Sequence, residues 1–354
     1  MPGKTPNHFE HTFYEREIAP FLPDQVLDFH THIWMPDQWK NAGGNEGVDR
    51  VSLVSEEKKE AAKYMTSSTE YSVENLLSDA AEAFSDRPYN AVVFGAPCPD
   101  ADNKRTNSYV ASVSASRPNL FPLRVTGKAL SETASDVRRE IDTQGFYGYK
   151  VFLDWLGDEY PPLVFDDMVS EEQCALADEK GLIILLHVPR SGRLADPEVG
   201  KSVREAALRW KNARFVLAHC GRCYRFEEIR EALRWVADLP NVWFDCSMVM
   251  DPTVHAYILQ RMDPTHYLFA TDYPIAAMRG RRVNIADHWV DVVLPGPAEG
   301  HYRVITDNMR ASFMTHEIVK AVLIGSELAG LSSLQTRNIF FQNGMSLLQE
   351  VRRK

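Results

Sequence analysis

The chain has 354 residues, of which 44% are hydrophobic, so it is long enough for two average domains or for one large α/β barrel with insertions. Its formal net charge of −10 and its pI near 5.6 argue against a nucleic-acid partner, which would require a basic surface. No apolar run approaches the roughly 20 residues needed to span a bilayer, so we expect no membrane partner. The amino terminus is polar, and the five cysteines are odd in number and scattered. Together these features predict a cytoplasmic protein with reduced thiols.

Short apolar runs recur along the chain, as expected for strands that are buried on both faces of a parallel sheet. Taken in order, they end near His30, Gly95, Thr126, Phe152, His187, His219, Cys246 and Thr271. Helical patterns occupy segments between them, namely 106–117, 132–143, 171–180, 201–211 and 225–239. This alternation predicts one α/β domain over residues 1–354, a (β/α)₈ TIM barrel.

Two segments depart from the strand–helix rhythm. Residues 33–90 are far longer than an ordinary βα loop and follow the strand end that carries His30 and His32. We therefore predict an insertion over the barrel mouth. Residues 310–354 show helical patterns again and predict extra C-terminal helices.

The first predicted strand ends in a His-x-His pair, His30 and His32. Residues two apart on a strand point to the same side, so both imidazoles can reach one ion. His187, His219 and Asp272 follow three later strands, whose carboxyl ends meet at one rim of a parallel barrel. Each residue alone is compatible with a structural role, but their joint placement predicts a site for a divalent metal ion, with Zn²⁺ as the default.

The sequence around these residues resembles the amidohydrolase superfamily. It is most similar to the amidohydrolase-related branch that includes aminocarboxymuconate semialdehyde decarboxylase. The resemblance is carried by the segments DFHTHI at 28–33, LAHCGR at 217–222 and ATDYP at 270–274. It implies one bound metal ion, zinc or else manganese or iron, held by His30, His32, His187 and Asp272.

The same resemblance implies that His219 and Asp272 are catalytic. Lys150 lies on the fourth predicted strand, where binuclear members of the superfamily place a carboxylated lysine that bridges two ions. The branch that this chain resembles often carries a lysine there without using it as a bridge. We therefore predict an uncarboxylated Lys150 with a structural or substrate-binding role.

Arginines and tryptophans near the predicted strand ends indicate an anionic or aromatic substrate. Arg190 and Arg222 follow the fifth and sixth predicted strands, and guanidinium groups suit carboxylate recognition. Trp34 and Trp155 follow the first and fourth, where a flat substrate could stack on them. The alternatives are surface ion pairs for the arginines and packing of the insertion for the tryptophans.

Hydrolysis of a small lactone, amide or ester ranks first among the expected reactions, because the superfamily as a whole favours it. Non-oxidative decarboxylation of an aromatic or unsaturated acid is the alternative, since the same metal site would serve it. A barrel that binds metal and ligand without turnover is the third hypothesis. Relatives also point to a homodimer, which no surface pattern in the sequence establishes.

Overall fold

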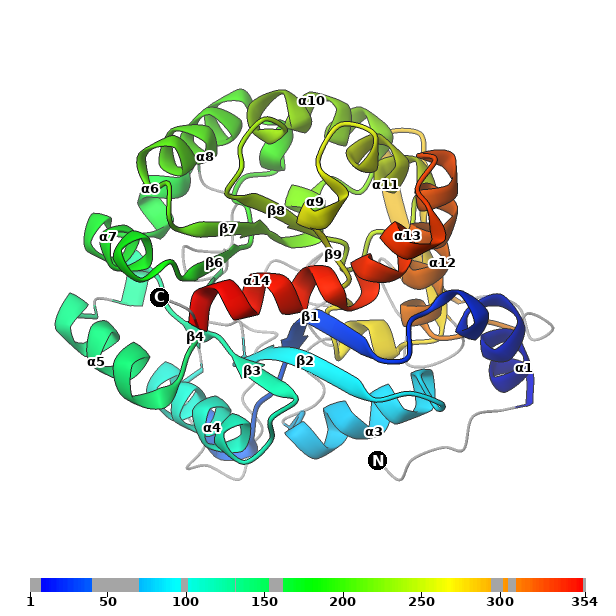
Figure 1. Cartoon of the computed structure of the whole chain (residues 1–354), viewed down its shortest axis with the longest axis horizontal. Coiled ribbons are helices and arrows are strands. Elements are labelled where there is room, and N and C mark those ends of the chain that lie inside the picture. Colours follow the sequence, from blue (N-terminus) through cyan, green and yellow to red (C-terminus); the bar gives the residue numbers. More distant parts are fainter. Residues whose placement is uncertain are drawn as a thin grey trace.

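The computed structural model describes residues 8–39, 70–96, 101–130, 132–152, 162–293, 302–304 and 310–352. Within these ranges the strands occur in the predicted order, surrounded by helices (Figure 1). The strands of the barrel are β1 Val26–His32, β2 Tyr89–Phe94, β3 Leu120–Pro122, β4 Arg124–Val125, β5 Gly148–Val151, β6 Ile183–Leu186, β7 Arg214–Leu217, β8 Val242–Asp245 and β9 Tyr267–Leu268.

Parallel pairing joins β1 to β2 and β3, and joins β4 through to β9 in sequence order. β3 and β4 form one strand position, because only Leu123 separates them and its N–H donates to the Val93 carbonyl of β2 at 2.9 Å. The barrel closes between β9 and β1, where Phe29 N–H donates to the Phe269 carbonyl at 2.9 Å. The described strands thus form the predicted TIM barrel.

Helices lie between the described strands, and each of the five predicted helical segments matches one of them to within a few residues. They are α3 Val73–Ala83, α4 Asn103–Ala115, α5 Ala134–Gln144, α6 Phe165–Met168, α7 Glu171–Lys180, α8 Pro197–Arg209, α9 Ala218–Arg222, α10 Phe226–Val236 and α11 Pro252–Leu259. α7 shows why they begin and end where they do. The Ser170 hydroxyl caps the N–H of Gln173, and Gly181 ends the helix with φ 63°, a conformation that favours glycine.

Helices at both ends of the chain complete the barrel. They are α1 His8–Glu17, α12 Met314–Leu328, α13 Ser333–Phe340 and α14 Gln342–Arg352, so the predicted C-terminal helices are present. α14 lies across the barrel (Figure 1). Its Asn343 side chain donates to the Tyr267 carbonyl at 2.8 Å, at the start of β9. α14 therefore covers the amino-terminal end of the strands, opposite to the end that carries His32.

The predicted insertion after β1 is described only at its two ends. These ends are joined, because Trp34 and Tyr71 exchange backbone hydrogen bonds of 2.8 and 3.1 Å. Residues 40–69 lie outside the described residues, so their placement over the mouth stays a prediction. The second part of the segment contains α3, which is one of the helices around the barrel.

A small sheet that the sequence did not predict follows β9. It consists of β10 Gly280–Ile285, β11 His288–Val293 and β12 Tyr302–Val304.

Among the described helices, none is both long enough and apolar enough to cross a membrane. Cys174, Cys220, Cys223 and Cys246 are buried free thiols, and Cys98 lies outside the described residues.

Candidate metal centre

β1 places His30 and His32 on one side of the strand, and both side chains are buried at the carboxyl end of the barrel. Their ring centroids are 5.3 Å apart. The two rings therefore lie close together, as the two-residue alternation of a strand predicts, and their sharing of one ion stays a prediction.

Hydrogen bonds determine which nitrogen of each ring carries the proton. His30 Nδ1 lies 2.8 Å from a carboxylate oxygen of Asp245, and His32 Nδ1 lies 3.1 Å from the Gly95 carbonyl oxygen. Both partners are acceptors, so each Nδ1 is the donor, and burial lowers the pKa of both rings so that they are neutral. The Nε2 atom of each ring is consequently left as an acceptor with a lone pair, and that of His30 accepts from the Lys150 ammonium group at 3.2 Å.

Asp272 brings a carboxylate to these two lone pairs. Its backbone N–H donates to the His30 carbonyl at 2.9 Å, which ties the end of β9 to β1. Its Oδ1 lies 3.4 Å from His30 Nε2 and 3.2 Å from His32 Nε2. Three acceptors thus face one another, which is an arrangement that a cation would stabilise.

His219 lies next to this cluster on an unusual backbone. Residues 219–222 have positive φ angles of 54°, 52°, 68° and 61°, which form a left-handed turn after β7. Each of the three non-glycine residues in it costs about 1–2 kcal/mol. The His219 N–H donates to Asp245 Oδ1 at 2.9 Å, and Gly221 is required because a Cβ there would lie 2.6 Å from Leu194. A feature held at this cost indicates a functional position for His219.

The His219 ring centroid lies 4.9 Å from that of His30. Its Nδ1 lies 3.1 Å from the Ser247 carbonyl oxygen, so Nδ1 carries the proton and Nε2 does not. Burial lowers the pKa of His219 to about 4, which keeps the ring neutral at pH 7.

Asp245 is the site residue that the sequence prediction missed. It is the last residue of β8 and fully buried, and with His30 and His219 it forms a second group of potential ligand atoms within 4.8 Å of one another. Its contacts with His30 and His219 lower its pKa to about 2 although burial opposes this. The sequence did carry a signal for it, because Asp245 stands at the end of an apolar strand, just as His187 follows the apolar strand β6.

His187 lies beside the cluster and belongs to neither compact group of potential ligands among the described residues. Its ring stacks on Phe152 at 4.7 Å and lies 5.2 Å from the ring of His219. Its Nδ1 is buried and has no hydrogen-bond partner within the described part of the chain. The role of His187 as a ligand stays a prediction that this orphaned nitrogen supports.

Lys150 points directly into the cluster from β5. Its ammonium group donates to His30 Nε2 at 3.2 Å and lies over the rings of Phe94 and Phe152. The side chain is fully buried, and burial lowers the pKa of Lys150 to about 8. A charge held here fits a substrate-binding role.

Among the other predicted substrate contacts, Arg190 is bound by groups outside the His/Asp cluster. Arg190 donates to the Pro162 and Leu163 carbonyls and pairs with Asp196 and Glu198, so its contacts match the surface ion pair that was the alternative reading. Trp155 lies outside the described residues, so its predicted contact with the substrate stays a prediction.

Arg222 is buried, and its Nη1 donates to the Val188 and Arg190 carbonyls, so this nitrogen supports the left-handed turn. Trp34 is buried against Trp39 and Tyr71, which corresponds to packing of the insertion. Substrate binding by either residue stays a prediction.

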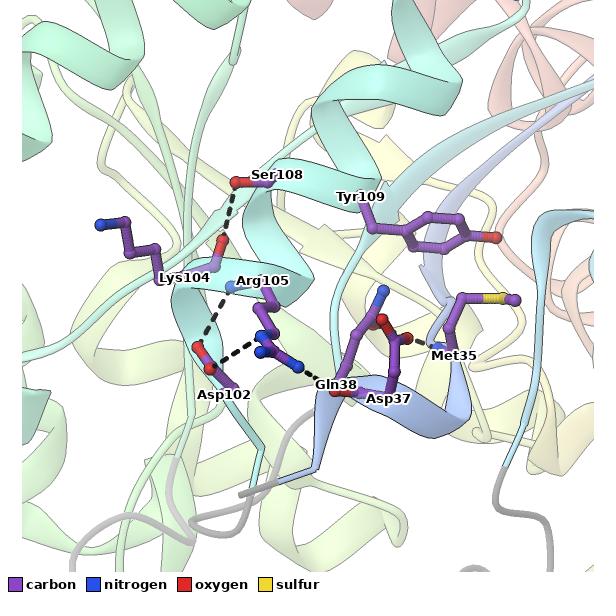
Figure 2. A pocket seen from close by; sticks show the side chains of 8 residues that line it. All are labelled: Met35, Asp37, Gln38, Asp102, Lys104, Arg105, Ser108 and Tyr109. Carbon is purple, nitrogen blue, oxygen red and sulfur yellow. Dashed lines mark hydrogen bonds and ion pairs between the residues drawn. The ribbon is translucent and has the colours of Figure 1, made fainter. Parts of the chain in front are cut away.

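A cavity of about 660 Å³ lies beside a short 3₁₀ helix, Pro36–Gln38, and the start of α4, and Figure 2 shows the side chains that line it. It is lined by Met35, Asp37, Gln38, Asp102, Lys104, Arg105, Ser108 and Tyr109. None of these residues belongs to the His/Asp cluster. Arg105 spans the cavity wall by donating to the Asp37 carbonyl at 2.9 Å and pairing with Asp102 at 3.5 Å.

Comparison with known proteins agrees with this geometry. The family described as Amidohydrolase matches residues 27–311. The chain belongs to the amidohydrolase family. It is therefore an enzyme, a metal-dependent hydrolase or decarboxylase, and the resemblance found in its sequence is confirmed. No curated protein matches the sequence significantly.

Solved amidohydrolase-like structures share the fold over nearly the whole chain. An amidohydrolase from Burkholderia multivorans has a TM-score of 0.57 at 12% identity, covering 92% of this chain and 99% of its own. 4-Oxalomesaconate hydratase from Rhodopseudomonas palustris has a TM-score of 0.54 at 13% identity, covering 93% and 97%. 2,6-Dihydroxybenzoate decarboxylase from Rhizobium has a TM-score of 0.51 at 14% identity, covering 93% and 99%. At these identities the likeness establishes the barrel fold of this amidohydrolase and not its reaction.

Proposed function

We propose that this amidohydrolase hydrolyses a small carboxylated or aromatic lactone, amide or ester with the help of one divalent metal ion. The observation that carries the proposal is the meeting of three acceptors, His30 Nε2, His32 Nε2 and Asp272 Oδ1, at the carboxyl end of the barrel. His219 lies beside them with a free Nε2.

The residues fit a borderline divalent ion, because neutral imidazoles and one carboxylate are the donors that Zn²⁺ takes in catalytic sites. His30, His32 and Asp272 would hold it, with His187 as the predicted fourth ligand. Zinc is the first choice, and manganese or iron are the alternatives. When bound, such an ion supplies Lewis acidity, which polarises a carbonyl group and acidifies water.

The chain's own groups can manage the protons of hydrolysis. The attacking water forms a bond to the carbonyl carbon and gives up a proton, which the Asp272 carboxylate can accept. The bond from that carbon to the leaving oxygen or nitrogen breaks, and the leaving group needs a proton. His219 can supply it only after its Nε2 has taken up a proton from solvent, because its other nitrogen donates to Ser247, and the proton on Asp272 returns to solvent when the product leaves.

A negatively charged substrate is supported by Lys150, whose ammonium group lies within the cluster. One similar solved structure is a probable 2-pyrone-4,6-dicarboxylic acid hydrolase from Acinetobacter baumannii, whose named substrate is both cyclic and carboxylated. That Lys150 is not a carboxylated metal bridge stays a prediction.

Decarboxylation is the second candidate. It is favoured by the likeness to 2,6-dihydroxybenzoate decarboxylase and by a buried cation, Lys150, beside the acceptors, which could hold a carboxylate before it leaves as carbon dioxide.

One experiment separates the two reactions. The zinc-loaded protein is incubated in ¹⁸O-labelled water with a panel of carboxylated aromatic lactones, amides, esters and free acids, and a chelator-treated sample serves as control. Hydrolysis adds one labelled oxygen to the product, whereas decarboxylation releases carbon dioxide and adds none. Turnover that persists unchanged after complete metal removal would refute both proposals.

A further inference from the structure

Asp245 is a fully buried carboxylate outside the predicted ligand set, and both of its oxygens accept hydrogen bonds. The Oδ2 atom accepts from His30 Nδ1 at 2.8 Å. The Oδ1 atom accepts from the backbone N–H groups of His219 and Ser247 at 2.9 and 3.1 Å, and from the Ser247 hydroxyl. One carboxylate therefore contacts a predicted metal ligand on β1 and the turn that carries the predicted acid–base residue.

Ser247 extends this contact to the second imidazole. Its hydroxyl hydrogen is donated to Asp245, so the same oxygen is left to accept from His219 Nδ1, which lies at 2.8 Å. The Ser247 carbonyl accepts from the same nitrogen at 3.1 Å. Both rings are thus held with the proton on Nδ1 and with the lone pair on Nε2, and the His30 lone pair accepts from Lys150 at 3.2 Å.

We propose that Asp245 is a positioning residue that fixes the Nδ1–H tautomer of His30 directly and orients His219 through Ser247. The inference rests on the proposed metal site but not on the proposed reaction. It explains why β8, which supplies none of the predicted ligands, ends in a fully buried carboxylate. Acceptors of this kind behind a ligating histidine set its orientation and typically change metal affinity by 10- to 100-fold when they are removed.

Asp245→Asn makes the inference testable, because only one orientation of the Asn amide keeps the hydrogen bonds from the backbone N–H groups of His219 and Ser247. The two backbone N–H groups of His219 and Ser247 cannot rotate, so the amide oxygen must face them. The amide NH₂ group then faces His30 Nδ1, which can relieve the clash of two donors by moving its proton to Nε2. His30 would in that case lose the lone pair that now accepts from Lys150 and that a metal ion would use, and its new N–H would face the Asp272 carboxylate at 3.4 Å.

Asp28→Asn is a matched control. Asp28 is equally buried and also contacts His30, but it accepts from the backbone N–H at 3.1 Å and not from the ring. Its second oxygen accepts from the Tyr89 and Thr271 hydroxyls, which can rotate to accept from an amide. This variant changes a neighbouring charge without changing the partner of the imidazole.

The readouts are long-range ¹⁵N–¹H NMR of ¹⁵N-histidine-labelled, metal-free protein, and competition of Zn²⁺ against a chromophoric chelator. Circular dichroism verifies folding. For Asp245→Asn we expect the His30 signals to change from the Nδ1–H to the Nε2–H pattern, and the zinc affinity to fall at least 10-fold. For Asp28→Asn we expect the wild-type tautomer and an affinity within 2-fold of wild type.

Ser247→Ala removes only a hydroxyl group and tests whether Ser247 links Asp245 to His219. We expect the Nδ1–H resonance of His219 to move, with zinc affinity within 2-fold of wild type. The double variant Asp245→Asn/Ser247→Ala removes the Ser247 oxygen that lies 3.3 Å from His30 Nδ1 and could replace the lost acceptor. If His30 keeps its Nδ1–H tautomer and its zinc affinity in both the single and the double Asp245 variants, the proposal is wrong. None of these results depends on a substrate, so failure of the proposed hydrolysis would leave them interpretable.

Discussion

His316 makes the stability of this protein sensitive to acid at a place far from the metal centre. The ring is buried on α12, where Nε2 donates to the Ala83 carbonyl at 2.8 Å and Nδ1 accepts from the Ser312 hydroxyl at 2.6 Å. Burial lowers the pKa of His316 to about 4. This histidine therefore joins α12 to the end of α3 in its neutral form.

The sign and size of the effect follow from linkage. In the unfolded chain the histidine takes up a proton below a pKa of about 6.5, whereas the folded protein resists protonation until about pH 4. Stability from this group is thus complete above about pH 6.5 and is lost as the pH falls towards 4. At pH 5 the loss amounts to about 2 kcal/mol.

His316→Gln keeps both hydrogen bonds, because a Gln amide can donate to Ala83 and accept from Ser312, but it cannot titrate. We expect urea unfolding between pH 7 and pH 5 to show a loss of stability that is smaller by about 2 kcal/mol in this variant than in the wild type. His288→Gln, which removes an exposed histidine on β11, serves as the control and should behave as the wild type. An equal loss of stability in His316→Gln and wild type would refute the reasoning.

Three further predictions concern the metal centre. Elemental analysis of the purified protein should give about one divalent ion per chain, and a value near two would show that Lys150 bridges two ions. Asp272→Ala should abolish turnover and weaken metal retention, and an unchanged metal content and rate would contradict its assignment as a ligand. His219→Ala should retain the metal but lower kcat about 10²- to 10⁴-fold, the range for loss of a general acid–base group; full activity in steady-state assays would remove its catalytic role.

The sequence alone determined the barrel and the main part of the candidate site. A parallel strand that is buried on both faces must be continuously apolar, so its last residues stand out where polar ligands begin. His30 and His32 could be predicted as candidate ligands because they end such a strand. Two-residue periodicity also places both on one side of it. Asp272 could be predicted as a candidate ligand because it follows the last apolar strand.

Only the tertiary structure decided what these residues contact. Asp245 was overlooked because its importance lies in a hydrogen bond to His30, which is 215 residues away in the chain. Arg190 was predicted to contact the substrate, and only the structure shows that its guanidinium group forms ion pairs with Asp196 and Glu198. The left-handed turn at His219 was equally hidden, because local preferences oppose it and contacts across the barrel maintain it. Local patterns encode periodicity and burial, whereas the partner of a polar group depends on which distant strands the closed barrel brings together.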